Sequence, residues 1–328
     1  MKAILIQNPG KNSSLCIEER SRPEPNGSEI LVRIRATAVN RADLLQRSGN
    51  YPPPEGASDI PGLEMGGVVE EVGAHVTKWK KGDRVFGLLP GGGYAQYCTL
   101  HESLAMAVPS QMSFAEAAAI PETFLTAFQA LYWLANVQEK ETVLIHAGGS
   151  GVGTAAIQLC RHLSDAHIIT TAGQEYKLKT AKKLGADLAY NYKTRDYAEE
   201  ITRELGSAPV DVIVDFIGKP YWHKNMEILA MDGRVVYLSF LGGHAVEDMS
   251  LIPILRKRLS IMGSTLRNRP ERYKIALVRA FTVQALSLFD AGILQPVIDS
   301  TFDWHHAEKA HQRMRENKNT GKIVLEVM

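Results

Sequence analysis

The sequence predicts an α/β fold in which a doubly wound parallel sheet is inserted into a β-rich domain. Three observations support this. Short strands separated by glycines fill the first hundred or so residues, strands and helices alternate through residues 142–240, and a last strand pattern appears at residues 321–327. Alternating strands and helices are typical of parallel βαβ units. A last strand that returns to the first domain makes the parallel sheet an insertion, and we expect the functional site in the cleft between the two bodies.

The N-terminal region alternates in the manner of half-buried strands. Residues 30–39 alternate between aliphatic side chains and the polar side chains of Arg33 and Arg35. Residues 66–73 and 83–87 are short β-like runs bounded by glycine. These patterns predict short strands in a turn-rich, partly open barrel or sandwich.

The pattern changes near Ser113, where Ser113 and Glu116 form a capping box ahead of an alanine-rich helical run. Beyond it, apolar runs and amphipathic runs follow one another, and Asp232-Gly233 predicts a turn before the last of these strands. The expected strands are residues 142–147, 166–171, 188–190, 210–215 and 235–240, and the expected helices are residues 151–163, 175–184 and 222–230.

After residue 263 the alternation relaxes. We expect a long helix over residues 270–290, a strand at 297–302, a helix at 306–315 and a final strand at 321–327. We expect this tail to return to the first domain.

Composition limits the classes of function. The chain has 328 residues, with 37 Lys and Arg against 36 Asp and Glu. This balance argues against a surface-wide attraction to nucleic acid or acidic membranes. Three scattered cysteines cannot build a four-cysteine zinc site or a closed disulfide framework. No apolar run approaches the roughly 18 residues of a spanning helix, so we expect a cytoplasmic protein.

A glycine-rich loop at residues 147–153 joins a predicted strand to a predicted helix. Glycines there allow a sharp turn and a close approach of a pyrophosphate to backbone N–H groups, and the helix N-terminus adds partial positive charge. A glycine-rich loop alone is a weak signal, but here strand, loop, helix and second strand follow in order. We therefore expect a dinucleotide cofactor.

The end of the second strand bears on which dinucleotide binds. NAD enzymes usually carry an acidic residue there for the ribose hydroxyls, whereas this chain reads Thr171-Ala172-Gly173-Gln174. Glu175 is expected to begin the next helix. Lys177 lies close enough to pair with a 2′-phosphate, although it could equally be a solvated helix residue. The missing acid and the lysine together favour NADPH.

These motifs converge on a known family. The chain resembles the zinc-free quinone reductases of the medium-chain dehydrogenase/reductase superfamily, and most closely their p53-inducible branch. The resemblance covers nearly the whole chain and is carried by residues 40–47, 49–54, 89–97, 118–128 and 319–325, together with the glycine loop.

The resemblance implies a GroES-like catalytic domain, residues 1–120 and 265–328, around an NADPH-binding Rossmann domain, residues 121–264. It implies an NADPH:quinone oxidoreductase that acts as a homodimer on a small-molecule quinone. We expect pairing through the edge of the Rossmann sheet, with residues 235–238 as the pairing surface. No nucleic-acid or membrane partner is implied.

The resemblance also assigns site residues. Asn40 and Tyr51 fall where the family faces nicotinamide and substrate, and Tyr51 is the expected contact to the substrate oxygen and a possible proton donor. Tyr51 could instead simply pack beside the prolines that follow it. The expected cofactor-binding residues are Thr126, Ser150, Gly151, Val152, Gly173, Lys177, Tyr192, Ile217, Leu241 and Gly242.

Two departures from related patterns affect the chemistry. Zinc-dependent relatives carry a histidine where this chain has Leu63, and a cysteine near the position of Asn40. Leucine cannot ligate zinc, so we expect no catalytic metal. The wider quinone-reductase loop has glycine where this chain has Ser150, whose hydroxyl could donate to a phosphate instead.

Two other functions stay open at this point. A reductase of 2-alkenals or enoyl thioesters uses the same hydride geometry. A non-catalytic NADPH-binding protein, crystallin-like or RNA-binding, is possible as well, although the neutral charge and the lack of aromatic-basic motifs count against RNA.

Overall fold

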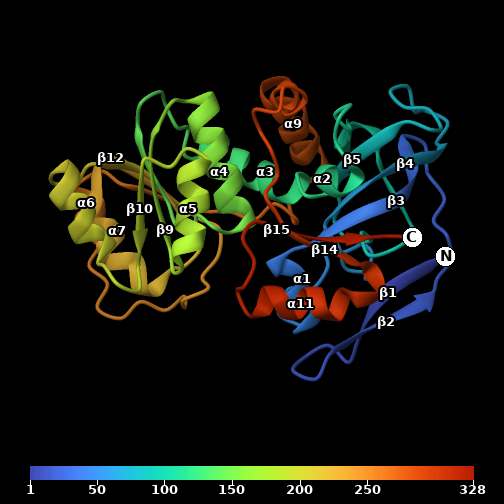
Figure 1. Ribbon diagram of the computed structural model, residues 1–328, viewed down its shortest axis with the longest axis horizontal. Coiled ribbons are helices and arrows are strands. Elements are labelled where there is room, and N and C mark those ends of the chain that lie inside the picture. The colour runs from blue at the N-terminus through green and yellow to red at the C-terminus, as the bar shows by residue number, and fades with distance from the viewer. The chain divides into compact units, whose positions relative to one another are not determined.

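The computed structural model describes residues 1–328 and divides them into two compact units (Figure 1). Unit 1 comprises Met1–Leu125 and Leu266–Met328, and unit 2 comprises Thr126–Thr265. Unit 1 is therefore discontinuous in sequence, and unit 2 lies within it as an insertion. The assignment of a catalytic role to one unit and a cofactor-binding role to the other stays a prediction.

Unit 1 is β-rich. Its strands are β1 (Lys2–Gln7), β2 (Ser14–Glu19), β3 (Glu29–Val39), β4 (Glu64–Val72), β5 (Arg84–Leu88), β6 (Tyr97–His101), β7 (Ala105–Ala107), β14 (Ile298–Asp303) and β15 (Lys322–Glu326). Its helices are α1 (Arg41–Arg47), α2 (Phe114–Ala118), the start of α3 (Pro121–Phe128), α9 (Glu271–Phe281), α10 (Ser287–Asp290) and α11 (Ala307–Arg315).

The main sheet of unit 1 has the order β14-β15-β3-β4-β5-β7, and β6 also pairs with β3. The long strand β3 joins both halves of the sheet: its start pairs with β4 and β6, and its end pairs antiparallel with β15. The pairing Ile323↔Val39 confirms that the tail of the chain returns to the first domain. It also brings Lys322 next to the end of β3, where the residue following the strand is Asn40.

Unit 2 is built from alternating strands and helices. Its strands are β8 (Thr142–Ile145), β9 (His167–Ala172), β10 (Leu188–Asn191), β11 (Val210–Asp215), β12 (Leu229–Tyr237) and β13 (Ser260–Gly263). Its helices are α4 (Gly151–Leu163), α5 (Glu175–Lys183), α6 (Tyr197–Leu205), α7 (Trp222–Ile228) and α8 (Ile252–Arg256).

All six strands of unit 2 are parallel, in the order β10-β9-β8-β11-β12-β13, and helices flank the sheet (Figure 1). The chain starts in the middle of the sheet, at β8, builds outward to β10, and then resumes beside β8 with β11. This is the order of a doubly wound dinucleotide-binding sheet, and ligands bind such sheets beyond the carboxyl ends of the strands at the switch point between β8 and β11. The predicted fold class is confirmed.

Several expectations about elements were wrong in detail. Asp232 and Gly233 do not make a turn before a strand that starts at 235. They lie inside β12, where Asp232 has φ +62° and the pairing with β11 shifts register. The sequence patterns also missed α1, α6 and β13.

The edge of the parallel sheet is therefore not where we expected it. Residues 235–238 overlap β12, which pairs with β11 on one side and β13 on the other, so they are not a free pairing surface. The edge strands are β10 and β13, and Ile261 on β13 is 37% exposed. No helix in the structure has both the length and the hydropathy needed to span a membrane.

Candidate functional site

The glycine loop of unit 2 turns the chain from β8 into α4. Ala147 adopts a left-handed conformation, with φ +52°, directly after the strand. Ser150 caps α4, because its Oγ accepts a hydrogen bond from the Gly153 N–H at 3.0 Å. Gly151 and Val152 are the first two residues of the helix, so their N–H groups have no intrahelical partner. The loop therefore fits a pyrophosphate group.

Two glycines fit closely against predicted cofactor-binding side chains. A Cβ atom on Gly149 would lie 2.8 Å from Cβ of Lys177, and one on Gly173 would lie 2.7 Å from the hydroxyl of Tyr192 and 3.0 Å from Cε of Lys193. Lys177 thus packs over the glycine loop, and Tyr192 and Lys193 pack against the end of β9. Lys193 adds a second cation at this edge that the sequence patterns did not single out.

The acidic residue nearest the end of β9 is already engaged. Glu175 is the first residue of α5, and its Oε1 accepts a hydrogen bond from Asn191 Nδ2 at 2.8 Å. A carboxylate that binds the two ribose hydroxyls of NAD has to present its oxygens to the ligand. Glu175 instead joins α5 to the end of β10.

The loops after β11 and β12 are joined by backbone hydrogen bonds. Leu241 N–H donates to Phe216 at 2.9 Å, and Gly242 N–H donates to Ile217 at 2.8 Å. The predicted residues Ile217, Leu241 and Gly242 therefore lie together beyond the carboxyl ends of the strands. Thr126 lies on α3, and no hydrogen bond joins it to this group.

A buried polar network lies under these loops, at the ends of β8, β9 and β11. Asn225 Nδ2 donates to Asp215 Oδ2 at 2.7 Å, so Asn225 Oδ1 must accept from its two other neighbours. These are Tyr197 Oη and His146 Nε2, each at 2.9 Å. His146 therefore carries its proton on Nε2, and Nδ1 accepts from Thr171 Oγ1 at 2.9 Å.

Asp215 connects this network to the loop after β11. Its Oδ1 accepts hydrogen bonds from the N–H groups of Ile217 at 2.5 Å and Gly218 at 3.1 Å. Burial lowers the pKa of His146, which keeps the imidazole neutral and the tautomer fixed. The network thus sets the path of the loop that contains Ile217.

Unit 1 contains a second buried network, and this one is charged. Lys322 Nζ donates to Glu64 Oε1 at 2.6 Å and to Asn40 Oδ1 at 2.5 Å. Asn40 Nδ2 donates to the same Glu64 oxygen at 2.8 Å. The main-chain N–H of Glu122 completes the set by donating to Glu64 Oε2 at 2.8 Å. The amide of Asn40 is therefore occupied within the protein, so Asn40 positions other groups.

Two further carboxyl groups surround this network. Asp43 accepts from Asn40 N–H at 2.7 Å and from Gly62 N–H at 3.1 Å, which completes the capping of α1. Burial raises the pKa of Asp43 to about 6. Burial and the neighbouring Glu64 carboxylate raise the pKa of Glu122 to about 8. Unit 1 thus holds carboxyl groups that are protonated, in part or fully, near neutral pH.

Tyr51 is partly buried in the loop after α1. Its ring lies against the guanidinium of Arg267, with 5.4 Å from Cζ to the ring centroid. Burial and the Glu122 carboxylate raise the pKa of the Tyr51 hydroxyl, and Arg267 lowers it. Tyr51 is therefore a neutral phenol at physiological pH and can donate a proton or a hydrogen bond.

The residues at the metal position of zinc-dependent relatives do not fit zinc. Leu63 is 1% exposed and belongs to the apolar core. The ammonium of Lys322 already lies on the oxygens of Glu64 and Asn40, where it would repel a second cation. No cluster of three His, Cys, Asp or Glu side chains suited to a metal ion occurs in the chain. We derive no step through a metal.

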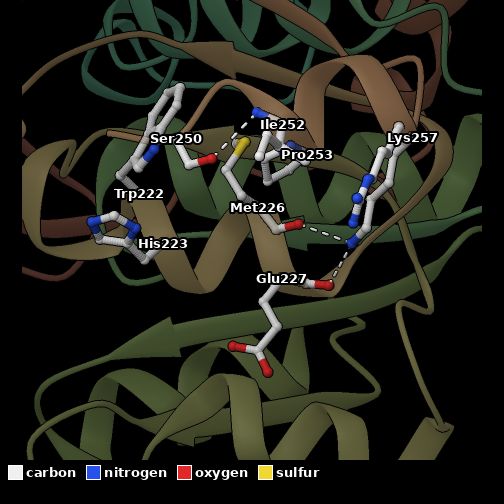
Figure 2. A pocket seen from close by; sticks show the side chains of 9 residues that line it. Trp222, His223, Met226, Glu227, Ser250, Ile252, Pro253 and Lys257 are labelled. Carbon is white, nitrogen blue, oxygen red and sulfur yellow. Dashed lines mark hydrogen bonds between the residues drawn. The ribbon is translucent and has the colours of Figure 1, made fainter. Parts of the chain in front are cut away.

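A surface pocket of about 350 Å³ lies between α7 and α8 of unit 2 (Figure 2). None of the predicted cofactor-binding residues lines it. Figure 2 shows Lys257 directed at the end of α7, where Nζ donates to the main-chain oxygens of Met226 and Glu227 at 2.9 and 2.7 Å. Lys257 therefore caps a helix, and its ammonium is already engaged by the protein rather than held ready for an anionic ligand.

Sequence patterns missed Glu64, Lys322 and Arg267 as site residues. The pair Glu64 and Lys322 is separated by 258 positions, and no local pattern joins them. The sequence contains part of the signal. Glu64 begins an apolar strand and Lys322 begins the last strand of the chain, and a charge at the start of a buried strand has to be paired in the folded protein.

Known proteins resemble the chain along its whole length. Residues 26–127 match the family model "Alcohol dehydrogenase GroES-like domain", and residues 151–282 match "Zinc-binding dehydrogenase". "Quinone oxidoreductase-like protein 2" of Bos taurus is 31% identical, over 97% of this chain and 94% of that protein.

Two solved structures share the fold. The quinone oxidoreductase of Thermus thermophilus, whose structure was also determined with NADPH, has a TM-score of 0.83 and 29% identity, over 99% of this chain and 100% of that one. The CurK enoyl reductase has a TM-score of 0.87 and 28% identity, over 100% and 99% of the two chains. Both likenesses extend over both units, so they relate whole proteins. The chain belongs to the medium-chain dehydrogenase/reductase superfamily and is an oxidoreductase related to its quinone oxidoreductases and enoyl reductases.

Proposed function

We propose that the chain is an NADPH-dependent quinone reductase that works without a metal. The observation that carries the proposal is the arrangement at the end of β9, where Lys177 packs on the glycine loop and Tyr192 and Lys193 pack against Gly173. Two lysines suit a 2′-phosphate, and the nearby Glu175 is held by Asn191. The Thermus relative, solved with NADPH, supports the same choice.

When bound, NADPH supplies a hydride from its nicotinamide ring to the acceptor. Ser150, Gly151 and Val152 bind the pyrophosphate through the N-terminus of α4. Lys177, Tyr192 and Lys193 bind the adenosine 2′-phosphate, and Gly173 leaves room for the side chains of Tyr192 and Lys193 to pack against the end of β9. Thr126, Ile217, Leu241 and Gly242 orient the nicotinamide end, in the roles that the resemblance assigns to them.

A quinone suits a site that lacks a Lewis acid. One carbonyl oxygen accepts the hydride and forms an O–H bond, while the ring takes up the electron pair and becomes aromatic, which leaves the negative charge on the other oxygen. The protein then has to hold the acceptor, exclude water and supply a proton. Tyr51 does the last of these, since its phenol is neutral and no hydrogen bond within the protein engages it. Asn40 positions the site through Glu64 and Lys322.

An enoyl or 2-alkenal reductase is the second candidate, and the likeness to the CurK enoyl reductase favours it. Both reactions need the same cofactor geometry, so the acceptor has to be tested directly. The test is to measure kcat/KM with NADPH for 1,2-naphthoquinone and for a series of 2-alkenals. We expect the quinone to be reduced faster.

The same experiment separates all three functions. Faster turnover of the alkenals would replace quinone reduction by enone reduction. Tight NADPH binding with no oxidation by either class would point instead to the non-catalytic, crystallin-like or RNA-binding alternative. A Tyr51→Phe variant with unchanged quinone kinetics would remove Tyr51 as the proton donor and leave the cofactor assignment intact.

We also propose a homodimer that pairs through the edge of the unit 2 sheet. β13 is one of the two edge strands, it pairs with a strand on one side only, and Ile261 on it is exposed. A monomeric mass in solution would contradict this. A cytoplasmic location stays a prediction from the sequence.

A further inference from the structure

Arg267 is a buried cation that has only neutral hydrogen-bond partners. It is 4% exposed, its Nε donates to the carbonyl of Pro90 at 2.8 Å, and its Nη2 donates to Gln46 Oε1 at 2.9 Å. The remaining nitrogen, Nη1, is buried and has no partner. Buried charges are ordinarily paired with an opposite charge, because leaving water is costly. A fixed guanidinium without a carboxylate partner therefore needs an explanation.

The two hydrogen bonds hold the guanidinium against Tyr51. Its Cζ lies 5.4 Å from the centroid of the Tyr51 ring, within the range of a cation–π contact. Gln46 is itself fixed, since its Nε2 donates to the carbonyl of Asp59 at 3.0 Å. Lys274 Nζ donates to the main-chain oxygen of Arg267 at 3.0 Å and holds that segment. Tyr51 thus lies over a cation whose position is set by residues far apart in the sequence.

Charged groups from three elements act on this pair. Glu122, on α3, raises the pKa of Tyr51, whereas Arg267 lowers it, and burial is the largest effect. Asp43 on α1 and Lys274 on α9 also lie near Arg267, and Glu64 and Lys322 act on Glu122. Arg267 is the positive group whose guanidinium contacts the Tyr51 ring. Its charge favours the phenolate form of Tyr51 and opposes the effect of Glu122.

We propose that Arg267 is a positioning residue for the reduction of quinones, which stabilises the phenolate left when Tyr51 gives its proton to the reduced quinone. The inference rests on the proposed function. The quinone accepts a hydride from NADPH and becomes the hydroquinone monoanion. The O–H bond of Tyr51 then breaks, its proton forms the second O–H bond of the hydroquinone, and the charge passes to the Tyr51 oxygen. A proton from water restores the phenol.

The first test measures the acidity of Tyr51 and does not need activity. The protein is labelled throughout with 3-fluorotyrosine, and its fluorine NMR spectrum is followed against pH. The chain has 11 tyrosines, and the Tyr51 signal is the one lost in a Tyr51→Phe variant. In Arg267→Gln we expect the midpoint of the Tyr51 titration to rise by about one pH unit.

Three further variants control the test. Arg269→Gln removes a cation two positions along the chain that lies over Tyr273 instead, 4.6 Å from its centroid, and should leave Tyr51 unchanged. Glu122→Gln removes the opposing charge and should lower the midpoint of the Tyr51 titration. The direction of the charge effect on Tyr51 can therefore be measured even if Arg267→Gln folds poorly. Arg267→Lys keeps the charge and should retain most of the effect. An unchanged midpoint in Arg267→Gln, or in Arg267→Lys a rise as large as in Arg267→Gln, would overturn the proposal.

The second test measures turnover. A weaker acid donates its proton more slowly, so Arg267→Gln should lower kcat for 1,2-naphthoquinone by about tenfold, with a smaller change in KM, and should move the alkaline limb of the kcat profile to higher pH. A shifted Tyr51 midpoint with wild-type kcat would overturn the role in catalysis. A wild-type protein that reduces no quinone at all would instead refute the proposed function, and the fluorine titration would still report on the pair.

Discussion

The two units each contain a buried polar network at the position where function is expected, and the two networks are built differently. The network of unit 1 is ionic, with Lys322 bonded to Glu64 and Asn40. The network of unit 2 is mostly neutral, and its one carboxylate, Asp215, is satisfied by Asn225 and by backbone N–H groups. An internal ion pair fixes charge in unit 1, whereas directional hydrogen bonds fix the path of the loops at the strand ends of unit 2.

This difference suggests what each network does. Lys322 supplies a positive charge beside Glu64, so unit 1 can keep several carboxyl groups in a small volume. His146 and Asn225 supply no charge, but each has a defined donor and acceptor, so together they allow only one arrangement of the strand ends. The following predictions test this contrast.

The largest effect is expected from breaking the ion pair of unit 1. Lys322→Met leaves the Glu64 carboxylate buried without its counter-ion and should lower the free energy of unfolding by about 3–5 kcal/mol. Denaturant unfolding measures it. Lys318→Met, which changes a lysine with a 64% exposed side chain nearby in the chain, should cost under about 1 kcal/mol.

A double variant shows whether the cost comes from the unpaired charge. In Glu64→Gln with Lys322→Met both charges are gone, and much of the lost stability should return. If Lys322→Met alone costs no more than its surface control, the ion pair does not hold unit 1 together.

A smaller loss is expected from removing the centre of the unit 2 network. Asn225→Ala removes one hydrogen bond from each of His146, Tyr197 and Asp215 and should cost about 2–3 kcal/mol. Unlike Lys322→Met, it should also weaken cofactor binding, because Asp215 positions the loop of Ile217. Thermal unfolding and a cofactor titration measure both. His223→Ala, an exposed change on the same helix, is the control, and equal behaviour of the two variants would contradict the contrast.

The charge density of unit 1 should make stability depend on pH through Glu122. Its pKa is raised from 4.5 to about 8, so the folded state binds this proton more tightly than the unfolded state. Its contribution to stability is full below about pH 4.5 and is lost as the pH rises through about 8.

Glu122→Gln removes this dependence. The free energy of unfolding of the variant, relative to that of the wild type, should rise by about 1–2 kcal/mol between pH 5 and pH 8. This figure is smaller than the full pKa shift would give, because Glu122 is partly exposed to solvent. Urea unfolding at the two pH values measures the difference. A wild type whose stability rises relative to Glu122→Gln over this range would reverse the assigned direction.

The smallest effect is expected from a substitution of Lys193 in unit 2. Lys193→Gln removes one partly solvated cation near Gly173 and should weaken NADPH binding roughly threefold to tenfold, an energy of about 1 kcal/mol. Binding of NADH should not change. Titration at two salt concentrations tests whether the loss of affinity is electrostatic, because the attraction between a lysine and the 2′-phosphate weakens as the salt concentration rises.

Local patterns predicted unit 2 better than unit 1. The helix at Gly151–Leu163 and the strand at Val210–Asp215 were predicted from the hydrophobic pattern of each segment. Each pattern lies within the segment itself. The edge strand β13 was missed because its four residues, Ser260–Gly263, alternate too briefly to stand out. The turn prediction at Asp232 and Gly233 was wrong because Asp and Gly favour turns and also favour a left-handed conformation inside a strand, so the two cases look alike in the sequence.

The site could be predicted only in part. Residues in the glycine loop and at the end of β9 could be singled out as candidates because they are nearly consecutive in the sequence, and their cofactor-binding roles stay predictions. Tyr51 was found by resemblance, but the cation beneath it was not, since Arg267 and Tyr51 meet only through the fold. His311 shows the same limit: it is fully buried, and its Nε2 lies 2.9 Å from the hydroxyl of Tyr94, 217 positions away in the sequence.

The central claim is that the chain uses NADPH through Lys177, and the most direct measurement is the dissociation constant of the two reduced cofactors. NADPH and NADH are titrated into the wild type and into Lys177→Gln, and their fluorescence is followed. We expect the wild type to bind NADPH at least about tenfold more tightly than NADH, a preference of about 1.4 kcal/mol or more, and Lys177→Gln to lose most of it. Equal affinities in the wild type, or a preference for NADH, would contradict the account.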